Sequence, residues 1–331
     1  MSLADKDFLL EMHQPRWTSS WVWVGFVVSF FTLQGALGIA LFWGWWWLAL
    51  PAIPVLAHLM HAHLVAFHEA SHGTLCPNPR VNDFFGMFIG MLSFMSLSLY
   101  RATHHSHHAY LATERDEELW PFNVPGTPRW LRCLAAGAEL SLGLLYTPAL
   151  FLRAFLRSGS PVQNPSVRHR IWMELAFMAA VWAAILTATA WLNGWGYFLV
   201  LFLIPALLAG SMQSTRKYIE HMGLAGSTPL SATRSIITPG PVGRLIAFSL
   251  FNEPFHGVHH KYARLPQDAL PCFAGELSPT RPEELSPYPS YRVAFCEMIK
   301  TLSDPRVGPQ WQTASQHCLP PAQAPQRLAA G

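Results

Sequence analysis

The sequence is poor in charged residues. Asp, Glu, Lys and Arg together make up 12% of its 331 residues, whereas soluble domains carry about 25%. This deficit argues against an ordinary cytosolic enzyme and against a disordered chain, which combines high charge with low hydrophobicity. The net charge of +3 is small, and it argues against a nucleic-acid-binding protein because such proteins carry a strongly basic face.

Cysteine is scarce as well, and its spacing follows no known pattern. The five cysteines are far apart and include no C-x-x-C pair, which argues against a disulfide framework and against a zinc ribbon. We expect them to be reduced and structural. The sequence also lacks a P-loop and a G-x-G-x-x-G motif, which are the usual signatures of nucleotide binding.

Apolar residues, by contrast, are abundant and make up 51% of the chain. About 20 apolar residues cross the hydrocarbon core of a bilayer. Four runs are expected to span the membrane in two hairpins, at about residues 21–42, 44–67, 171–192 and 196–212. Residues 84–99 form a run that is too short to span, and residues 134–152 are interrupted by Glu139 and Pro148. We expect both to be interfacial or membrane-dipping helices.

The basic residues predict the orientation of these spans. Two of the 22 Lys and Arg residues precede the first span, nine lie between Arg80 and Arg170, and eleven follow from Arg216 onward. Neither hairpin turn, at residues 43–47 and 193–195, contains one. The positive-inside rule therefore places both turns outside and both termini in the cytoplasm. The first run exceeds the length of a signal peptide core and is expected to stay as an anchor.

These observations predict an all-α integral membrane protein with four transmembrane helices, interfacial helices and a cytoplasmic histidine-rich cap. Residues 1–304 are expected to form a single domain. Residues 305–331 are rich in Pro, Gln and Ala and lack hydrophobic periodicity, which predicts a disordered tail.

The second excess is histidine, with 16 in a chain that is poor in other ionisable residues. Three clusters occupy residues 68–72, 103–108 and 255–260. Residues at i, i+3 and i+4 share one face of a helix. This spacing groups His68 with His72, His104 with His107 and His108, and His256 with His259 and His260. Neutral imidazole is a general ligand for transition metals, so we interpret the clusters as ligands of a shared site.

The predicted topology brings these eight histidines to one face of the membrane. A further candidate is His221, which follows the fourth predicted span on the same face. Nine histidines are too many for one metal ion and sufficient for two. We therefore expect a site with two metal ions at the cytoplasmic face.

The segments HEASH at 68–72, HHSHH at 104–108 and HGVHH at 256–260 together resemble the histidine boxes of the membrane fatty acid desaturase family. The resemblance covers about residues 20–270, and residues 218–223 are similar to the extra histidine motif of related alkane hydroxylases. It implies two iron ions that use dioxygen and two electrons to attack unactivated C–H bonds. It also implies an iron-ligand role for His68, His72, His104, His107, His108, His221, His256, His259 and His260.

Some members of the family have Asn directly after the first histidine of the third box, where this chain has Gly257. Asn252, one turn earlier, is a candidate substitute. Four acidic residues either orient the ligand imidazoles or are solvated charges: Glu69, Asp116, Glu220 and Glu253. Three basic residues either contact a lipid head group or only mark the cytoplasmic side: Arg101, Arg216 and Lys217.

The remaining histidines are expected to play other roles. His105 points about 100° away from its neighbours on a helix, so we expect it to support a ligand or to be exposed. His58, His61 and His63 lie within the second predicted span and either line a polar path beneath the metals or bond to neighbouring helices. His13, His169 and His317 are expected at the surface.

The sequence thus predicts a membrane oxidoreductase that desaturates a fatty acyl chain or a related lipid. The closest alternative is a hydroxylase or ketolase of an alkane, a carotenoid or a sphingolipid. A zinc-dependent membrane hydrolase needs only three or four ligands, and a metal carrier should bind near the bilayer midplane, so both fit less well. The sequence contains no H-P-G-G haem motif, and we expect a separate electron donor such as a ferredoxin, a rubredoxin or a cytochrome.

Overall fold

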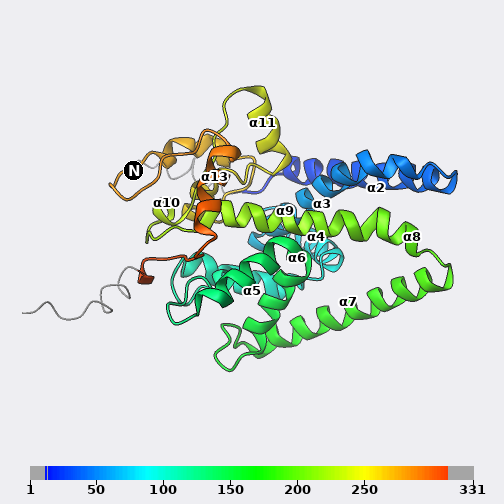
Figure 1. The fold of residues 1–331 in the computed structure, drawn as a ribbon, viewed down its shortest axis with the longest axis horizontal. Coiled ribbons are helices and arrows are strands. Elements are labelled where there is room, and N and C mark those ends of the chain that lie inside the picture. The colour runs from blue at the N-terminus through cyan, green and yellow to red at the C-terminus, as the bar shows by residue number, and fades with distance from the viewer. Residues whose placement is uncertain (1–11, 13, 312–331) are drawn as a thin grey trace, which may run out of the picture.

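The apolar runs fold into long helices, as Figure 1 shows for this computed structural model. The structure describes residue 12 and residues 14–311, and this part of the chain contains no β-strand. The long helices are α2 (Trp17–Phe42), α3 (Ala49–His72), α6 (Arg129–Leu156), α7 (Pro165–Trp191) and α9 (Ile204–His221). A short 3₁₀ turn, η1 (Trp46–Leu48), precedes α3, while α8 (Trp195–Phe198) and a π-helical turn, η3 (Leu199–Leu203), precede α9.

Five of these helical segments are long and apolar enough to cross a membrane: Trp17–Phe42, Trp46–His72, Arg129–Leu156, Pro165–Trp191 and Trp195–His221. Their outward side chains are apolar, and Leu50 and Trp191 are exposed by 82% and 85%. Large exposed apolar surfaces of this kind are typical of lipid contact rather than of contact with water. The protein is therefore a multi-pass membrane protein.

Four of the five segments coincide with the predicted spans, whereas α6 lies where an interfacial helix was expected. Glu139 does not interrupt α6, because its carboxylate is buried and pairs with Lys217 of α9, and it also accepts a hydrogen bond from the Tyr218 hydroxyl at 3.0 Å. The helix bends at Leu142, whose φ and ψ are −127° and 34°. The partner of Glu139 is 78 residues away, and no local pattern in the sequence indicates this pairing. The count of four spans stays a prediction.

The stretch at residues 84–99, expected as one short helix, divides into two. Helix α4 (Pro79–Leu92) and helix α5 (Leu97–Ala109) meet at an angle of 98°. The side chain of Asn78 caps α4 by accepting from two backbone N–H groups, and the hydroxyl of Ser96 caps α5 by accepting from Leu99 N. A helix pair with this bend is either a broken span or a re-entrant segment, consistent with the predicted membrane-dipping geometry.

The two hairpin turns lie at the same end of the molecule. The ring centroids of Trp46 and Tyr197 are 5.7 Å apart, and both turns are at the right of Figure 1, far from α10 and α13. Helix α3 starts near this end and runs for 24 residues to His72, a length of about 36 Å. Helix α9 runs in the same direction and ends at His221. Both helices therefore deliver a histidine to the end opposite the turns.

Short helices and loops form a cap at that opposite end. They are η2 (Glu117–Leu119), α10 (Pro229–Ala232), α11 (Gly240–Ser249), α12 (His256–Lys261), η4 (Leu270–Leu277) and α13 (Tyr291–Thr301). Residues 305–311, the start of the predicted tail, contact the cap: Val307 N and Trp311 Nε1 both donate to the carbonyl of Phe122. The rest of that tail, residues 312–331, lies outside the described residues.

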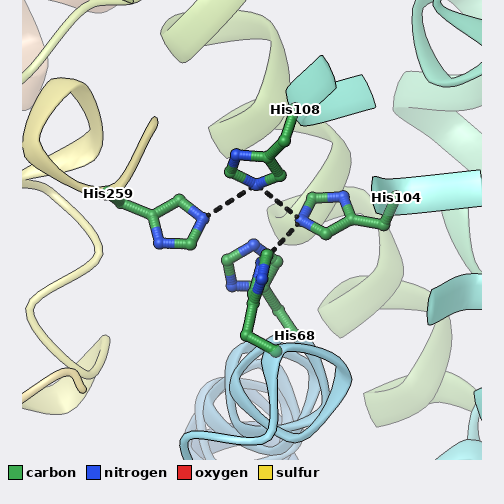
Figure 2. A group of neighbouring side chains, drawn as sticks. His68, His104, His108 and His259 are labelled. Carbon is green, nitrogen blue, oxygen red and sulfur yellow. Dashed lines mark hydrogen bonds between the residues drawn. The ribbon is translucent and has the colours of Figure 1, made fainter. Parts of the chain in front are cut away.

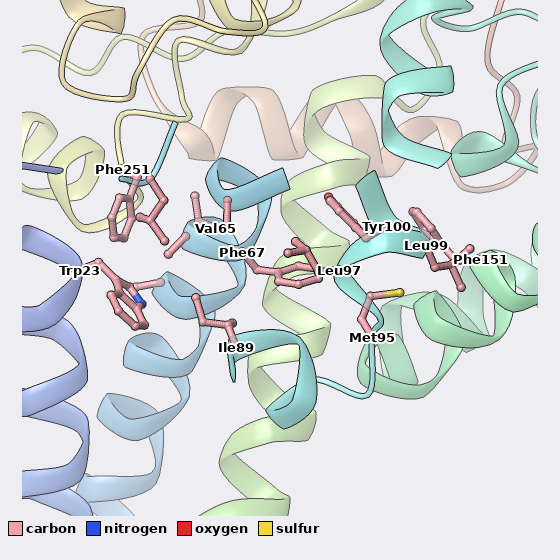
Figure 3. Close-up of a cluster of buried hydrophobic side chains, with 14 of the residues drawn as sticks. Trp23, Val65, Phe67, Ile89, Met95, Leu97, Leu99, Tyr100, Phe151 and Phe251 are labelled. Atoms are coloured by element: carbon pink, nitrogen blue, oxygen red, sulfur yellow. The ribbon is translucent and has the colours of Figure 1, made fainter. Parts of the chain in front are cut away.

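The largest buried cluster lies where the cap meets the membrane-spanning helices. Trp23, Phe67, Leu97 and Phe151 are among its members (Figure 3). Tyr100 joins this cluster to the polar end, because its ring stacks on Phe151 at 5.1 Å on one side and on His104 at 5.1 Å on the other. The apolar core therefore fixes the position of one of the candidate ligands.

Candidate metal centre

Four helices bring the nine predicted histidines together at the end opposite the turns. They come from α3 (His68, His72), α5 (His104, His107, His108), α9 (His221) and α12 (His256, His259, His260). The i, i+3, i+4 spacing works as expected because α3, α5 and α12 are helical at these residues. The histidines divide into two adjacent groups.

The first histidine group consists of His68, His72, His104, His108 and His259. Their ligand nitrogens all lie within 4.8 Å of one another. The Nε2 atoms of His72, His104, His108 and His259 form a chain of three contacts, each 3.1 Å long. Figure 2 shows the rings of His104, His108 and His259 turned toward a common centre next to His68.

The second histidine group, His107, His221, His256 and His260, combines two sets that share His221: His107 with His221 and His260, and His221 with His256 and Glu220. The Nε2 atom of His256 lies 2.9 Å from that of His221 and 3.1 Å from that of His260. The ligand nitrogens of His107, His221 and His260 also lie within 4.8 Å of one another. The ring of His108 in the first group stacks on that of His260 in the second, with their centroids 4.3 Å apart. The two groups are therefore in direct contact.

Two carboxylates orient histidines of α5, one in each group. His104 Nδ1 lies 2.8 Å from Glu118 Oε2, and His107 Nδ1 lies 2.8 Å from Asp116 Oδ2. Since an ionised carboxylate only accepts hydrogen bonds, each Nδ1 is the protonated nitrogen and donates. The Nε2 of each ring is then a bare lone pair that faces the group. Such a carboxylate behind a histidine is the usual support of a metal ligand.

A third carboxylate, Glu253, touches both groups. One oxygen of Glu253 lies 3.1 Å from Nδ1 of His68 and 3.8 Å from Nδ1 of His256. The guanidinium of Arg216 is 3.8 Å from the same oxygen and 2.7 Å from Glu220. The buried acidic residues thus have a buried cation beside them, as groups of this kind require. Glu220 in turn reaches to 3.6 Å from His256 Nε2.

The donor set fits transition-metal ions. A neutral imidazole carries one proton, and where Nδ1 holds it, Nε2 presents only a lone pair. His104 Nε2 is such an atom, yet it lies 3.1 Å from two further Nε2 atoms, those of His72 and His108. Its one lone pair cannot accept well from both. A cation between these nitrogens resolves the arrangement, and imidazole suits iron, zinc and copper.

The protonation state of the cap histidines agrees with this role. Burial, together with the neighbouring imidazoles, lowers the pKa of His256, His259 and His260 well below the ordinary value. All three are therefore neutral near pH 7, and the neutral form is the one that binds metal.

The other predicted residues lie elsewhere. His105 is exposed, with its ring 5.9 Å from that of His72, and His169 is exposed on α7 as expected. His13 and His317 lie outside the described residues. Among the three histidines within α3, His61 Nε2 contacts Gln213 Oε1 at 3.1 Å, as expected for a bond to a neighbouring helix.

The candidate head-group cations all have partners within the protein. Arg101 donates to Asp83 at 2.7 Å, Arg216 pairs with Glu220, and Lys217 pairs with Glu139. These pairings favour their interpretation as structural cations. Asn252 donates from Nδ2 to the carbonyl of Gln267 at 3.0 Å, and Gly257 N donates to the Ser235 hydroxyl at 2.8 Å.

Three parts of the site were missed by sequence reasoning. Glu118 was not singled out, although it lies in the acidic run at 114–118 beside Asp116, which was the available signal. The carbonyl of Ala232, 3.2 Å from His221 Nδ1, has no signal in the sequence because any residue supplies a carbonyl. Tyr100 precedes the second box by one turn and carries no motif.

Two cavities lie among the membrane-spanning helices on the side of the metal centre that faces Tyr100. The nearer, of about 60 Å³, is lined by Tyr100 and Glu118, both of which contact His104. It also passes the point where α6 and α9 approach most closely, because neither Gly143 nor Gly210 has room for a Cβ atom.

The farther cavity, of about 80 Å³, lies between α2, α3, α4, α6 and α9 and has an almost wholly apolar lining. Both cavities are lined by Leu64, Ser93 and Leu144, so they adjoin. Phe31 also lines the farther cavity and is exposed by 46%, so one of the residues that line this cavity also lies at the lipid-facing surface.

A family model described as fatty acid desaturase matches residues 44–292. The match includes all three histidine clusters, His221 and the cap helices through η4. No curated protein matches the chain.

Proposed function

The chain belongs to the fatty acid desaturase family, and we propose that it binds two iron ions and uses dioxygen and two electrons to desaturate a fatty acyl chain or a related lipid. The observation that carries the proposal is the pairing of two adjacent histidine-rich groups, one of five histidines and one of four with Glu220 beside it, at one end of a membrane-spanning helical frame. The family supports an oxidoreductase, and the nitrogen-rich donor set supports metal binding.

The proposed chemistry explains the need for a metal. A methylene C–H bond has no acidic proton and no leaving group, so acid–base side chains alone cannot activate it. Two bound iron ions would supply the oxidising power from dioxygen. Asp116 and Glu118 hold the rings of His107 and His104 in the orientation that this requires, and Glu253 lies 3.1 Å from His68. Arg216 lies 2.7 Å from Glu220 and 3.8 Å from Glu253.

The two adjoining cavities support an acyl chain as the substrate. Their lining is largely apolar, and they extend from Tyr100 and Glu118 beside His104 to Phe31 at the lipid-facing surface. A chain bound there lies out of water and beside the metal centre, as a reactive oxidising site requires. We propose that the substrate enters from the bilayer with its head group at the membrane face that carries the histidines.

The orientation and the electron source are part of the proposal. The basic residues support a cytoplasmic location for the termini and the histidines. Two electrons per turnover have to come from a separate donor, such as a ferredoxin, a rubredoxin or a cytochrome. The open cleft lined by His72, His105, His108 and Arg264 reaches the first histidine group directly, which makes it the shortest route for electrons from a docked donor.

Product analysis tests the reaction type. We expect lipids from cells that express the chain to contain acyl chains two mass units lighter than their precursors, and cells that express His104→Ala to lack them. An oxygenated product sixteen mass units heavier, without a new double bond, would instead identify a hydroxylase. A ketolase acting on a methylene group would give a product fourteen mass units heavier. Product that survives in His104→Ala would remove the proposed role of the histidine site.

A further inference from the structure

The farther cavity contains two polar groups that nothing in the described part of the chain satisfies. Trp23 is 3% exposed, and its Nε1 has no hydrogen-bond partner. His63 Nε2 is also buried without a partner. Both side chains line this cavity, whose other walls are almost entirely apolar. In Figure 3 the indole nitrogen of Trp23 lies on the side of the ring that faces Ile89, another lining residue.

Unpaired groups of this kind are unusual at membrane depth, because no water is present to replace the missing partner. Trp182 provides an internal comparison: it is similarly buried, at 8% exposure, and its Nε1 donates to the carbonyl of Met91 at 2.8 Å. Packing alone does not account for the pair. Trp23 and His63 meet edge to face with their centroids 6.5 Å apart, and this contact leaves both nitrogens without a hydrogen bond.

We propose that this cavity binds a hydrocarbon chain bearing an uncharged oxygen substituent, a hydroxyl or a carbonyl, which Trp23 and His63 hold by hydrogen bonds. The indole N–H donates to the oxygen. The neutral imidazole of His63 either donates to a carbonyl or accepts from a hydroxyl, according to its tautomer. The proposal rests on the proposed function in one respect, that a chain in this cavity is the substrate.

The lining argues against a charged group. Among the described residues that line the farther cavity, none is Asp, Glu, Lys or Arg, and an isolated charge in an apolar site is strongly unfavourable. The remaining amide, that of Gln34, is occupied because its Nε2 donates to the carbonyl of Leu201 at 3.0 Å. An uncharged oxygen on an otherwise apolar chain satisfies both unpaired nitrogens without these costs.

The position of the pair adds a positional preference. Trp23 and Gln34 both line the farther cavity, and they are separated by about 16 Å along α2. The unpaired nitrogens belong to Trp23 and His63. Trp23 lies at one end of this roughly 16 Å stretch of α2, so the hydrogen-bonding position is at one end of the stretch and not along all of it. Only chains with oxygen at a matching carbon can therefore bring it to the two nitrogens, and we expect selectivity among positional isomers.

A binding assay with the purified full-length protein in detergent micelles tests the proposal. Stearic acid and positional series of hydroxystearic and oxostearic acids compete with a fluorescent fatty acid. We expect at least one oxygenated isomer to bind about five-fold more tightly than stearic acid, the value of one net hydrogen bond. Trp23→Phe should lose this preference, whereas Trp21→Phe, a lipid-facing change on the same helix at 69% exposure, should keep it.

A second pair of variants, at His63, distinguishes the loss of a hydrogen bond from misfolding of the Trp23→Phe variant. His63→Leu should lose the preference, and His63→Gln, which keeps a hydrogen-bonding side chain, should retain part of it. A wild type that binds all isomers no better than stearic acid, or a preference unchanged in both Trp23→Phe and His63→Leu, overturns the proposal. The assay needs neither turnover nor bound metal, so its failure leaves the proposed reaction standing, and a failed turnover assay leaves the binding result standing.

Discussion

The two histidine groups use the same helices differently. The first takes its five histidines from α3, α5 and α12, while the second takes four from α5, α9 and α12 and has Glu220 beside it. Glu118 orients the first group, and Asp116 together with the Ala232 carbonyl orients the second. Among the carboxylates described above, Glu253 is the one that lies within 4 Å of a histidine in each group.

The difference predicts how firmly each group would hold a metal ion. A group with five histidines can lose one and still offer four nitrogens, whereas the second group falls to three. The second group also has one oxygen donor, Glu220, within the same 4.8 Å range as His221 and His256, but this carboxylate is paired with Arg216 at 2.7 Å and is therefore less available to a metal ion than a histidine nitrogen. We therefore expect the second site to depend more strongly on each histidine, and the first to hold its metal more firmly.

The largest expected effect is that of His221→Ala. It removes one of four histidines from the second group and breaks the 2.9 Å contact with His256. We expect one metal ion per chain to be lost and activity to fall by more than about 100-fold, because loss of a mere supporting partner already costs 10- to 100-fold. Metal analysis and lipid product analysis measure both. His169→Ala, an exposed change on α7, is the control, and full metal content in His221→Ala would argue against a second site.

His259→Ala is expected to have a smaller effect, of about 10- to 100-fold on activity, a range taken from weakened metal sites. It leaves four histidines in the first group, whose nitrogens lie within 4.8 Å of one another. Metal content after dialysis against a weak chelator should lie between that of wild type and that of His221→Ala. Equal losses in the two variants would show that the groups do not differ in the way proposed.

The supporting carboxylates come next. Asp116→Asn and Glu118→Gln keep the shape of each side chain but remove the charge that holds the histidine Nδ1–H. We expect about a ten-fold loss of metal affinity in each, from the second site in Asp116→Asn and from the first in Glu118→Gln. Spectra of the iron-loaded variants should show one altered site each, and identical changes in both variants would contradict the assignment.

The smallest effect is expected for His105→Ala. His105 is exposed and belongs to neither group, although it is flanked by His104 in the second box. We expect unchanged metal content and activity within about two-fold, because surface substitutions away from special features are usually nearly neutral. A large loss would move His105 into the metal centre.

Much of this site could be predicted from the sequence because the spacing of histidines translates directly into one face of a helix. His104, His107 and His108 converge because α5 is helical there, capped by Ser96. His221 was harder to place because it is a single histidine without a repeated spacing, and the histidines that it contacts belong to α5 and α12. The role of Glu118 depends on how the loop after α5 folds back, and periodicity does not encode that.

The fold was predictable where apolar runs are uninterrupted and unpredictable where a polar group has a distant partner. The hairpins formed by α2 with α3 and by α7 with α9 lie close to the predicted spans. Helix α6 was underestimated because Glu139 is compatible with a long helix only when Lys217 of α9 pairs with it. The break between α4 and α5 contains Phe94, whose φ is 58°. No sequence pattern predicts this left-handed conformation at a phenylalanine.

The central claim is that the nine histidines bind two iron ions, and metal counting by mass spectrometry on the purified, iron-reconstituted protein tests it most directly. We predict two iron ions per chain in wild type and one in His221→Ala, with zinc unable to restore activity. One zinc ion per chain, with no iron retained, would contradict a di-iron centre and favour a hydrolase instead.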